Sequence, residues 1–184
     1  LNSQTADGNF GPACNPDWWP RMVMLKVFVQ YYEATGDSRV IDFMKKYFSY
    51  QKENICRKPL ENWGAARAAE NIYCIYWLYN RTGEEFLLEL AGIIFKQGLD
   101  WTDIFTDFPY TRPIRYYYDW HKLQGKLPPW EEGVDYINFH THHVVNVAMG
   151  VKNPALYYQL TKDGIHMRAS ELAVQNLKRY HGQV

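Results

Sequence analysis

The chain repeats one short segment, each time after an apolar stretch with helical spacing. The copies are residues 32–37 (YEATGD), 79–84 (YNRTGE) and, more loosely, 158–163 (YQLTKD). The first two copies lie 47 residues apart. Gly36 and Gly83 suit the left-handed conformation that ends a helix, and the acid that follows suits the start of the next one. The pattern predicts a helix, a tight turn and a second helix.

The residues after each turn repeat in the same register. Val40, Ile41, Met44, Tyr47 and Phe48 correspond to Leu87, Leu88, Ala91, Ile94 and Phe95. Both sets are apolar and fall at helical spacing. The repeating unit is therefore a helical hairpin of about 47 residues, longer than a tetratricopeptide repeat. Such hairpins stack into solenoids or close into toroids.

We expect helices near residues 17–35, 38–53, 64–82, 84–99, 137–150 and 165–181. A short helix is expected at 155–161, separated from its predecessor by Pro154. The stretch 101–134 is rich in Pro, Gly and aromatic residues, which predicts an ordered functional loop. Six or seven helices are too few for a toroid of about twelve. The sequence therefore predicts an all-α fold of helical hairpins, and if these close into a toroid, residues 1–184 form about half of an (α/α)6 toroid domain, beginning and ending inside that domain.

Composition excludes some functions. A net charge of +0 argues against a nucleic-acid partner, and no apolar stretch approaches the roughly 20 residues of a membrane span. The 15 Tyr and 7 Trp suit sugar-stacking clefts or an aromatic-rich core. Cys14, Cys56 and Cys74 are too widely spaced for a zinc site, and we expect buried free thiols. Because the chain opens at Leu1 without Met, we interpret its start as an internal cut.

Three groups of residues are candidates for sugar binding. In the first, Asp17 and Arg21 could share a helix face beside Trp19; the alternative is a helix cap with a core Trp. In the second, Trp63, Arg67 and Asn71 recur at four-residue spacing on a helix that is apolar further on. A structural salt bridge, such as Arg67 with Glu70, is equally compatible with that pattern.

The third group is His140 and His143, which lie on one helix stripe with Asn146 or Val147. An imidazole can donate and accept hydrogen bonds at once, as a sugar hydroxyl requires. Metal binding and an ordinary core or surface position remain alternatives, although no nearby Cys or carboxylate completes a metal site. Candidate carboxylates exist, but no spacing selects a catalytic pair. They are Glu70, Asp119, Glu131, Glu132 and Asp135.

Several segments together resemble one family. They are residues 17–25 (DWWPRMVML), 31–37 (YYEATGD), 75–83 (IYWLYNRTG), 143–150 (HVVNVAMG) and 179–183 (RYHGQ). The chain resembles the β-L-arabinofuranosidase-like proteins of glycoside hydrolase family 127, formerly a domain of unknown function, and in particular a Bacteroidetes-type subgroup.

The resemblance implies an (α/α)6 barrel, usually followed by β-sandwich domains, in a periplasmic or secreted retaining hydrolase that acts on plant-type glycans. It also implies a zinc-bound cysteine nucleophile and a glutamate acid/base, in a Glu-Leu-Cys segment expected beyond Val184. We therefore assign no catalytic residue, metal or other cofactor to this segment, although the parent protein could bind zinc. His143 best matches a pocket histidine of the family. The expected partners are an oligosaccharide or polysaccharide and the remainder of the barrel. A polysaccharide lyase, with His143 or a Tyr as base, and a non-catalytic helical-repeat binding module are the alternatives.

Overall fold

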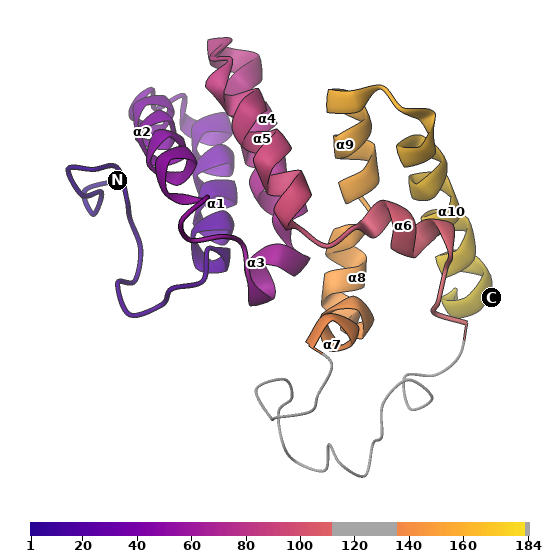
Figure 1. The fold of residues 1–184 in the computed structure, drawn as a ribbon. Helices are drawn as coiled ribbons and strands as arrows, with labels where there is room; N and C mark the ends of the chain where they lie inside the picture. The colour runs from indigo at the N-terminus through magenta and orange to yellow at the C-terminus, as the bar shows by residue number, and fades with distance from the viewer. Residues whose placement is uncertain (112–135, 183–184) are drawn as a thin grey trace. The chain divides into compact units, whose positions relative to one another are not determined.

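The computed structural model describes residues 1–111 and 136–182, and every regular element among them is a helix. This confirms the all-α prediction. The chain divides into two compact units, Leu1–Leu99 and Asp100–Val184, which are described separately below. Figure 1 shows the helices of each unit. In the part of the chain that the structure describes, no helix is long and apolar enough to cross a membrane.

The N-terminal unit is built from two helical hairpins. The first contains α1 (Trp19–Thr35) and α2 (Arg39–Asn54), and the second contains α4 (Ala68–Thr82) and α5 (Phe86–Gln97). A short helix, α3 (Asn62–Ala66), comes before α4. Helix α1 packs against α2 and α4, and α5 packs against α2 and α4 (Figure 1). The hairpins predicted from the 47-residue repeat are thus present and adjacent.

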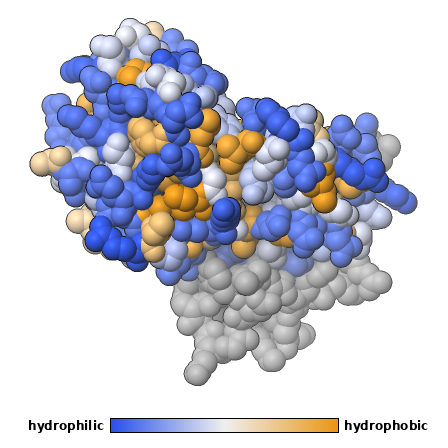
Figure 2. Space-filling model, turned by 45° about the horizontal axis from the view of Figure 1, so that its top comes forward, coloured by the Kyte–Doolittle hydropathy of each residue, from blue (hydrophilic) through white to orange (hydrophobic). Residues whose placement is uncertain are grey.

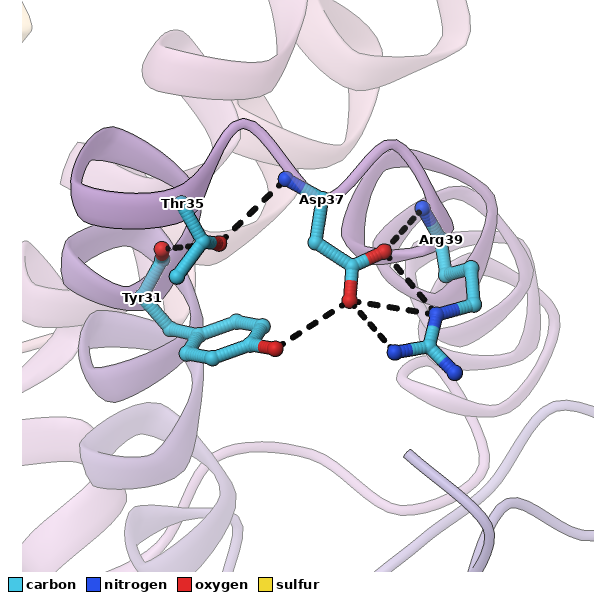
Figure 3. Close-up of polar contacts among 4 residues, drawn as sticks. All are labelled: Tyr31, Thr35, Asp37 and Arg39. Carbon is cyan, nitrogen blue, oxygen red and sulfur yellow. Dashed lines mark hydrogen bonds and ion pairs between the residues drawn. The ribbon is translucent and has the colours of Figure 1, made fainter.

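The turn between α1 and α2 shows why the repeated segment specifies a hairpin. Gly36 has φ 68° and ψ 15°, and its N–H donates to the Tyr32 carbonyl, which closes α1. The Thr35 hydroxyl donates to the Tyr31 carbonyl over 2.7 Å and accepts from the Asp37 N–H over 3.3 Å. The Asp37 carboxylate in turn accepts from the N–H at the start of α2, as Figure 3 shows. One helix end is therefore linked by local hydrogen bonds to the next helix start.

The other two copies adopt the same turn. Gly83 has φ 67°, and the Thr82 hydroxyl donates to a carbonyl in the last turn of α4. In the third copy Lys162 takes the left-handed position with φ 60°, and Thr161 makes the equivalent hydrogen bonds. The loose third repeat is confirmed, although a residue with a side chain occupies the conformation that glycine adopts more readily.

Aromatic and aliphatic side chains fill the space between these hairpins. Phe10, from the segment before α1, contacts the rings of Phe28, Phe43 and Tyr47 at centroid distances of 4.8–5.8 Å. Most of the residues that the repeat aligns on α2 and α5 are buried, but Ile41 and its equivalent Leu88 are only half-buried. The prediction of buried free thiols is right for Cys74 and wrong for Cys14 and Cys56, which are free but exposed because they lie outside the helix-packing faces.

The predicted helix 64–82 is divided. Arg67 has φ −114° and ψ 21°, so α3 ends and α4 begins at this residue. The first backbone N–H groups of α3, as in any helix, have no hydrogen-bond partner inside the helix. A side chain from the beginning of α1 satisfies two of them, as described for the candidate site.

The C-terminal unit contains α6 (Trp101–Thr106), α7 (Tyr136–His142), α8 (Val144–Gly150), α9 (Asn153–Thr161) and α10 (Gly164–His181). Helix α10 packs against α6 and α9. The prediction that 101–134 is entirely loop is wrong for 101–106, where the Asp100 carboxylate caps a short helix through the Asp103 N–H. Residues 112–135 lie outside the described part.

Tight packing joins α6 to α8. Trp101 is 1% exposed, and a Cβ added at Gly150 would lie 2.5 Å from its indole ring. Glycine at position 150 is therefore required by the close approach of the Trp101 ring.

The predicted helix 137–150 is interrupted at His143, whose φ of −71° and ψ of 117° are extended rather than helical.

Candidate functional site

Asp17 joins two helix starts that are far apart in sequence. Its Oδ1 accepts hydrogen bonds from the Trp19 N–H over 2.8 Å and the Gly64 N–H over 3.1 Å, and its Oδ2 accepts from the Trp63 N–H over 3.2 Å. A Cβ at Gly64 would lie 2.8 Å from Oδ1, so glycine permits this approach. Burial raises the pKa of Asp17, while the three N–H groups and the charge of Arg67 oppose that shift.

The same connection brings two tryptophans to one cation. The Arg67 guanidinium carbon lies 4.3 Å from the Trp19 ring centroid and 4.6 Å from that of Trp63. These are cation–π distances, and all three side chains are half-buried. We call Trp19, Arg67 and Trp63 the tryptophan–arginine stack. Desolvation lowers the pKa of Arg67, and the carboxylates of Asp17 and Glu70 oppose that lowering.

Arg21 does not project beside the Asp17 carboxylate, as one interpretation of the sequence expected. Its side chain is 4% exposed. The guanidinium donates to the carbonyls of Asp17 and Asn15 over 3.0 and 3.3 Å, and Nε donates to Asn9 Oδ1 over 3.2 Å. Arg21 therefore holds the segment before α1 in place, and Asp17 acts as a helix cap.

Asn71 lies deeper than the stack. It is fully buried, and its amide donates to Gln51 Oε1 over 2.9 Å. Glu70, 1% exposed, pairs with Lys26 Nζ over 2.6 Å, and its charge also acts on Arg67. The predicted group Trp63, Arg67 and Asn71 thus runs from a half-exposed surface into the core, because Arg67 interrupts the helix that was expected to align it.

In the C-terminal unit the candidate histidines occupy different environments. His140 is 1% exposed, and the Asn146 amide lies 3.1 Å from its Nδ1 and donates to its carbonyl over 3.1 Å. If Nδ1 is the acceptor, Nε2 carries the proton. His143 is half-buried at the start of α8, with its ring 5.8 Å from that of Phe139. The break at His143 means that the two residues do not share one continuous helix.

Sequence reasoning missed Tyr110 and His181. Nε2 of His181, at the end of α10, lies 2.6 Å from the Tyr110 carbonyl. The Tyr110 hydroxyl donates to the Thr141 carbonyl, and its ring meets that of His142 edge-on at 5.3 Å. His166 similarly lies 2.8 Å from the Thr102 hydroxyl. These contacts span 31 to 71 residues, so no local spacing could have indicated them.

No three His, Cys, Asp or Glu side chains of the described residues lie close enough together to hold a metal. The three cysteines are dispersed, two of them exposed and one buried. The described residues therefore do not form the Cys and Glu zinc site that the resemblance implies, and we derive no catalytic step through zinc. The candidate carboxylates Asp119, Glu131, Glu132 and Asp135 lie outside the described part.

Comparison with known proteins then decides the family. The sequence model described as "Beta-L-arabinofuranosidase, GH127 catalytic domain" matches residues 1–184, the whole chain. The chain belongs to this family. This confirms the resemblance found in the sequence. The GH127 family is a glycoside hydrolase family, which implies a sugar substrate. No curated protein and no solved structure gives a significant match.

Proposed function

We propose that this GH127 domain is part of a retaining glycosidase that removes a furanose or related sugar from plant-type glycans. The family match over residues 1–184 carries the proposal. In this proposal the segment supplies about half of an (α/α)6 toroid and part of the sugar-binding wall, and the catalytic centre lies elsewhere in the protein. The segment alone is expected to be inactive, and the protein to be periplasmic or secreted.

The tryptophan–arginine stack supports a sugar-binding role for the N-terminal unit. Indole rings offer a flat apolar surface to the C–H face of a sugar, and a guanidinium offers donors to its hydroxyl oxygens. Both rings remain partly exposed, whereas the other candidates near them are used structurally. In this proposal Trp19, Arg67 and Trp63 contact the sugar. Asp17 positions them, and Asn71 supports α4 from the core.

In the C-terminal unit we propose that His143 binds a sugar hydroxyl. Its half-buried position at the start of α8 supports contact with a ligand. His140, almost fully buried and adjacent to Asn146, is proposed to fix the preceding turn.

Hydrolysis of chromogenic pentofuranosides and galactofuranosides by the complete protein tests the proposal. Release of one sugar with retained anomeric configuration is expected. No hydrolysis with arabinose, xylose and galactose configurations would contradict it.

The role of the stack needs a separate variant. Loss of one stacked ring, in Trp63→Ala, should raise KM by about 2- to 12-fold, from roughly 0.5–1.5 kcal/mol of aromatic contact. Tyr73→Ala is the matched control, since Tyr73 is an exposed aromatic residue on α4 outside the stack. Equal KM values for the two variants would remove the stack from the binding site and leave the hydrolase proposal intact.

A further inference from the structure

Three uncharged polar side chains lie in the core of the N-terminal unit. Figure 2 shows hydrophilic residues over much of the face that it draws. Tyr47 and Gln51 of α2 and Asn71 of α4, by contrast, are each 0% exposed. Because Tyr47 and Gln51 are four residues apart, they lie on the same side of α2. We call these three residues the core polar cluster.

One hydrogen bond joins α2 to α4 within this cluster. The Nδ2 atom of Asn71 donates to Oε1 of Gln51 over 2.9 Å. The other polar atom of each amide, Gln51 Nε2 and Asn71 Oδ1, has no hydrogen-bond partner in the part of the chain that the structure describes, nor has the Tyr47 hydroxyl. Buried polar groups of native proteins almost always have a partner, because an unpaired one destabilises the fold. Three unpaired atoms on adjacent residues therefore point to one shared partner.

The groups around Tyr47 are apolar or already bonded. Its ring lies 4.8 Å from that of Phe10 and 5.5 Å from that of Phe48, centroid to centroid. Burial raises the pKa of Tyr47, although the charge of Arg21 opposes that shift, so the hydroxyl keeps its proton at neutral pH. The Arg21 guanidinium donates to acceptors in the segment before α1. The Tyr47 hydroxyl is thus a neutral donor and acceptor in an apolar part of the core.

The unpaired atoms define the chemistry of a ligand that would satisfy them. Gln51 Nε2 can only donate, Asn71 Oδ1 can only accept, and the Tyr47 hydroxyl can do either. A cation would face the N–H groups of Gln51, and an anion would face the amide oxygen of Asn71. None of the three side chains carries a charge that would compensate a buried ion. The ligand is therefore small and uncharged, and it donates and accepts hydrogen bonds at once, as water does.

This requirement does not depend on the orientation of the two amide groups. If both amides are flipped, Gln51 Nε2 donates to Asn71 Oδ1, and the acceptor Gln51 Oε1 and the donor Asn71 Nδ2 are left unpaired. The cluster then still presents one donor and one acceptor beside the Tyr47 hydroxyl. Either orientation calls for the same ligand.

We propose that the core polar cluster binds a buried water molecule between α2 and α4. The water accepts a hydrogen bond from Gln51, donates one to Asn71 and forms a third with the Tyr47 hydroxyl, and about three hydrogen bonds are usual for a buried water. Asn71 lies four residues after Arg67, so the water stabilises α4 one turn beyond the tryptophan–arginine stack. Asn71 thus binds water in the core and does not contact the sugar.

A crystal structure of the unsubstituted complete protein, at a resolution that shows ordered waters, tests the proposal. We expect an electron-density peak within hydrogen-bond distance of Gln51, Asn71 and Tyr47. The absence of a peak there overturns the proposal. A peak with the anomalous signal of a metal or halide ion also overturns it, as do direct hydrogen bonds among the three side chains that leave no atom unpaired.

Urea unfolding of Tyr47→Phe gives an independent measurement. If the hydroxyl binds water, its removal costs one hydrogen bond, and the equilibrium constant for unfolding should rise by about 2- to 12-fold. If the hydroxyl has no partner, its removal leaves that constant unchanged or lowers it, which overturns the proposal. Tyr73→Phe is the matched control, because Tyr73 is exposed on α4, and it should leave the constant unchanged.

Neither measurement depends on sugar hydrolysis, so this inference and the proposed function can fail separately.

Discussion

Replacing Asp17 with alanine tests whether one carboxylate organises the tryptophan–arginine stack. The substitution leaves three backbone N–H groups at the starts of α1 and α3 without their acceptor, at original distances of 2.8–3.2 Å. Loss of a capping acceptor costs about 1 kcal/mol, and contacts that share one group are not additive. We therefore expect Asp17→Ala to lower the free energy of unfolding by about 2–3 kcal/mol.

Asp17→Asn separates charge from hydrogen bonding. An amide oxygen at the Oδ1 position still accepts from Trp19 and Gly64, but the NH2 group then faces the Trp63 N–H. Loss of the negative charge adds no cost of its own, because burial penalises the charged carboxyl and raises its pKa despite the helix starts and Arg67. We expect a loss of about 1–1.5 kcal/mol, between the wild type and Asp17→Ala.

Urea unfolding followed by circular dichroism measures both variants. Asp42→Ala is the matched control, because Asp42 is an exposed acid in the first turn of α2. Its loss should be about 0.5 kcal/mol. A loss of less than about 0.5 kcal/mol for Asp17→Ala, or an equal loss for the control, would refute the capping argument. If Asp17 positions the stack, Asp17→Asn should also raise KM without a matching fall in kcat.

Three further predictions concern the turns, the core and pH. Gly83→Ala should lower the free energy of unfolding in urea by about 1 kcal/mol, because the left-handed φ of 67° disfavours a side chain. No atom lies within 4 Å of the added methyl group, so steric overlap adds nothing to this cost. A gain in stability from Lys162→Gly would support the same reasoning, and an unchanged stability for Gly83→Ala would contradict it. Gly150→Ala should cost about 1–3 kcal/mol by thermal melting, because the new Cβ meets an indole ring at 2.5 Å, and an unchanged melting temperature contradicts this. The pKa of Asp37 is about 2, held below 3.8 chiefly by hydrogen bonds from its arginine neighbour, so its stabilising contribution is present above pH 3.8 and lost as pH falls through about 2. Burial raises the pKa of Asp17, so its contribution instead declines as pH rises above 3.8, and carboxyl NMR titration should find Asp17 titrating above Asp37.

The parts of the fold that were predictable depend on local chemistry. The Thr-Gly-acid turns were predicted correctly because the hydroxyl, the left-handed residue and the acid all act within residues 31–39. The hairpin register followed from apolar spacing alone. Even the third turn was found, although Lys162 replaces glycine, because Thr161 and Asp163 supply the same hydrogen bonds.

The candidate site was less predictable because its contacts are distant in sequence. Residues 62–71 contain several alanines, so helix propensity gave no reason to break the helix at Arg67. The break accompanies Asp17 capping α3 from 46 residues away. Helix α6 was missed for the opposite reason, since a Pro- and Gly-rich composition over 101–134 concealed six helical residues that Asp100 caps.

A second arginine–tryptophan contact in the same unit shows what distinguishes the candidate site. Near the end of α4, Arg81 lies 4.0 Å from the Trp77 ring, and Glu33 accepts hydrogen bonds from both side chains. Trp77 is 8% exposed, so the indole ring of this contact is buried between α1 and α4. At the opposite end of α4, Arg67 also meets tryptophan, but Asp17 satisfies backbone groups and both indole rings stay partly exposed. The chemistry of the two contacts is the same, and their exposure differs. Of these two contacts, the one at Arg67 presents partly exposed indole rings, and the binding proposal therefore rests on Trp19 and Trp63 and not on the aromatic content of the chain.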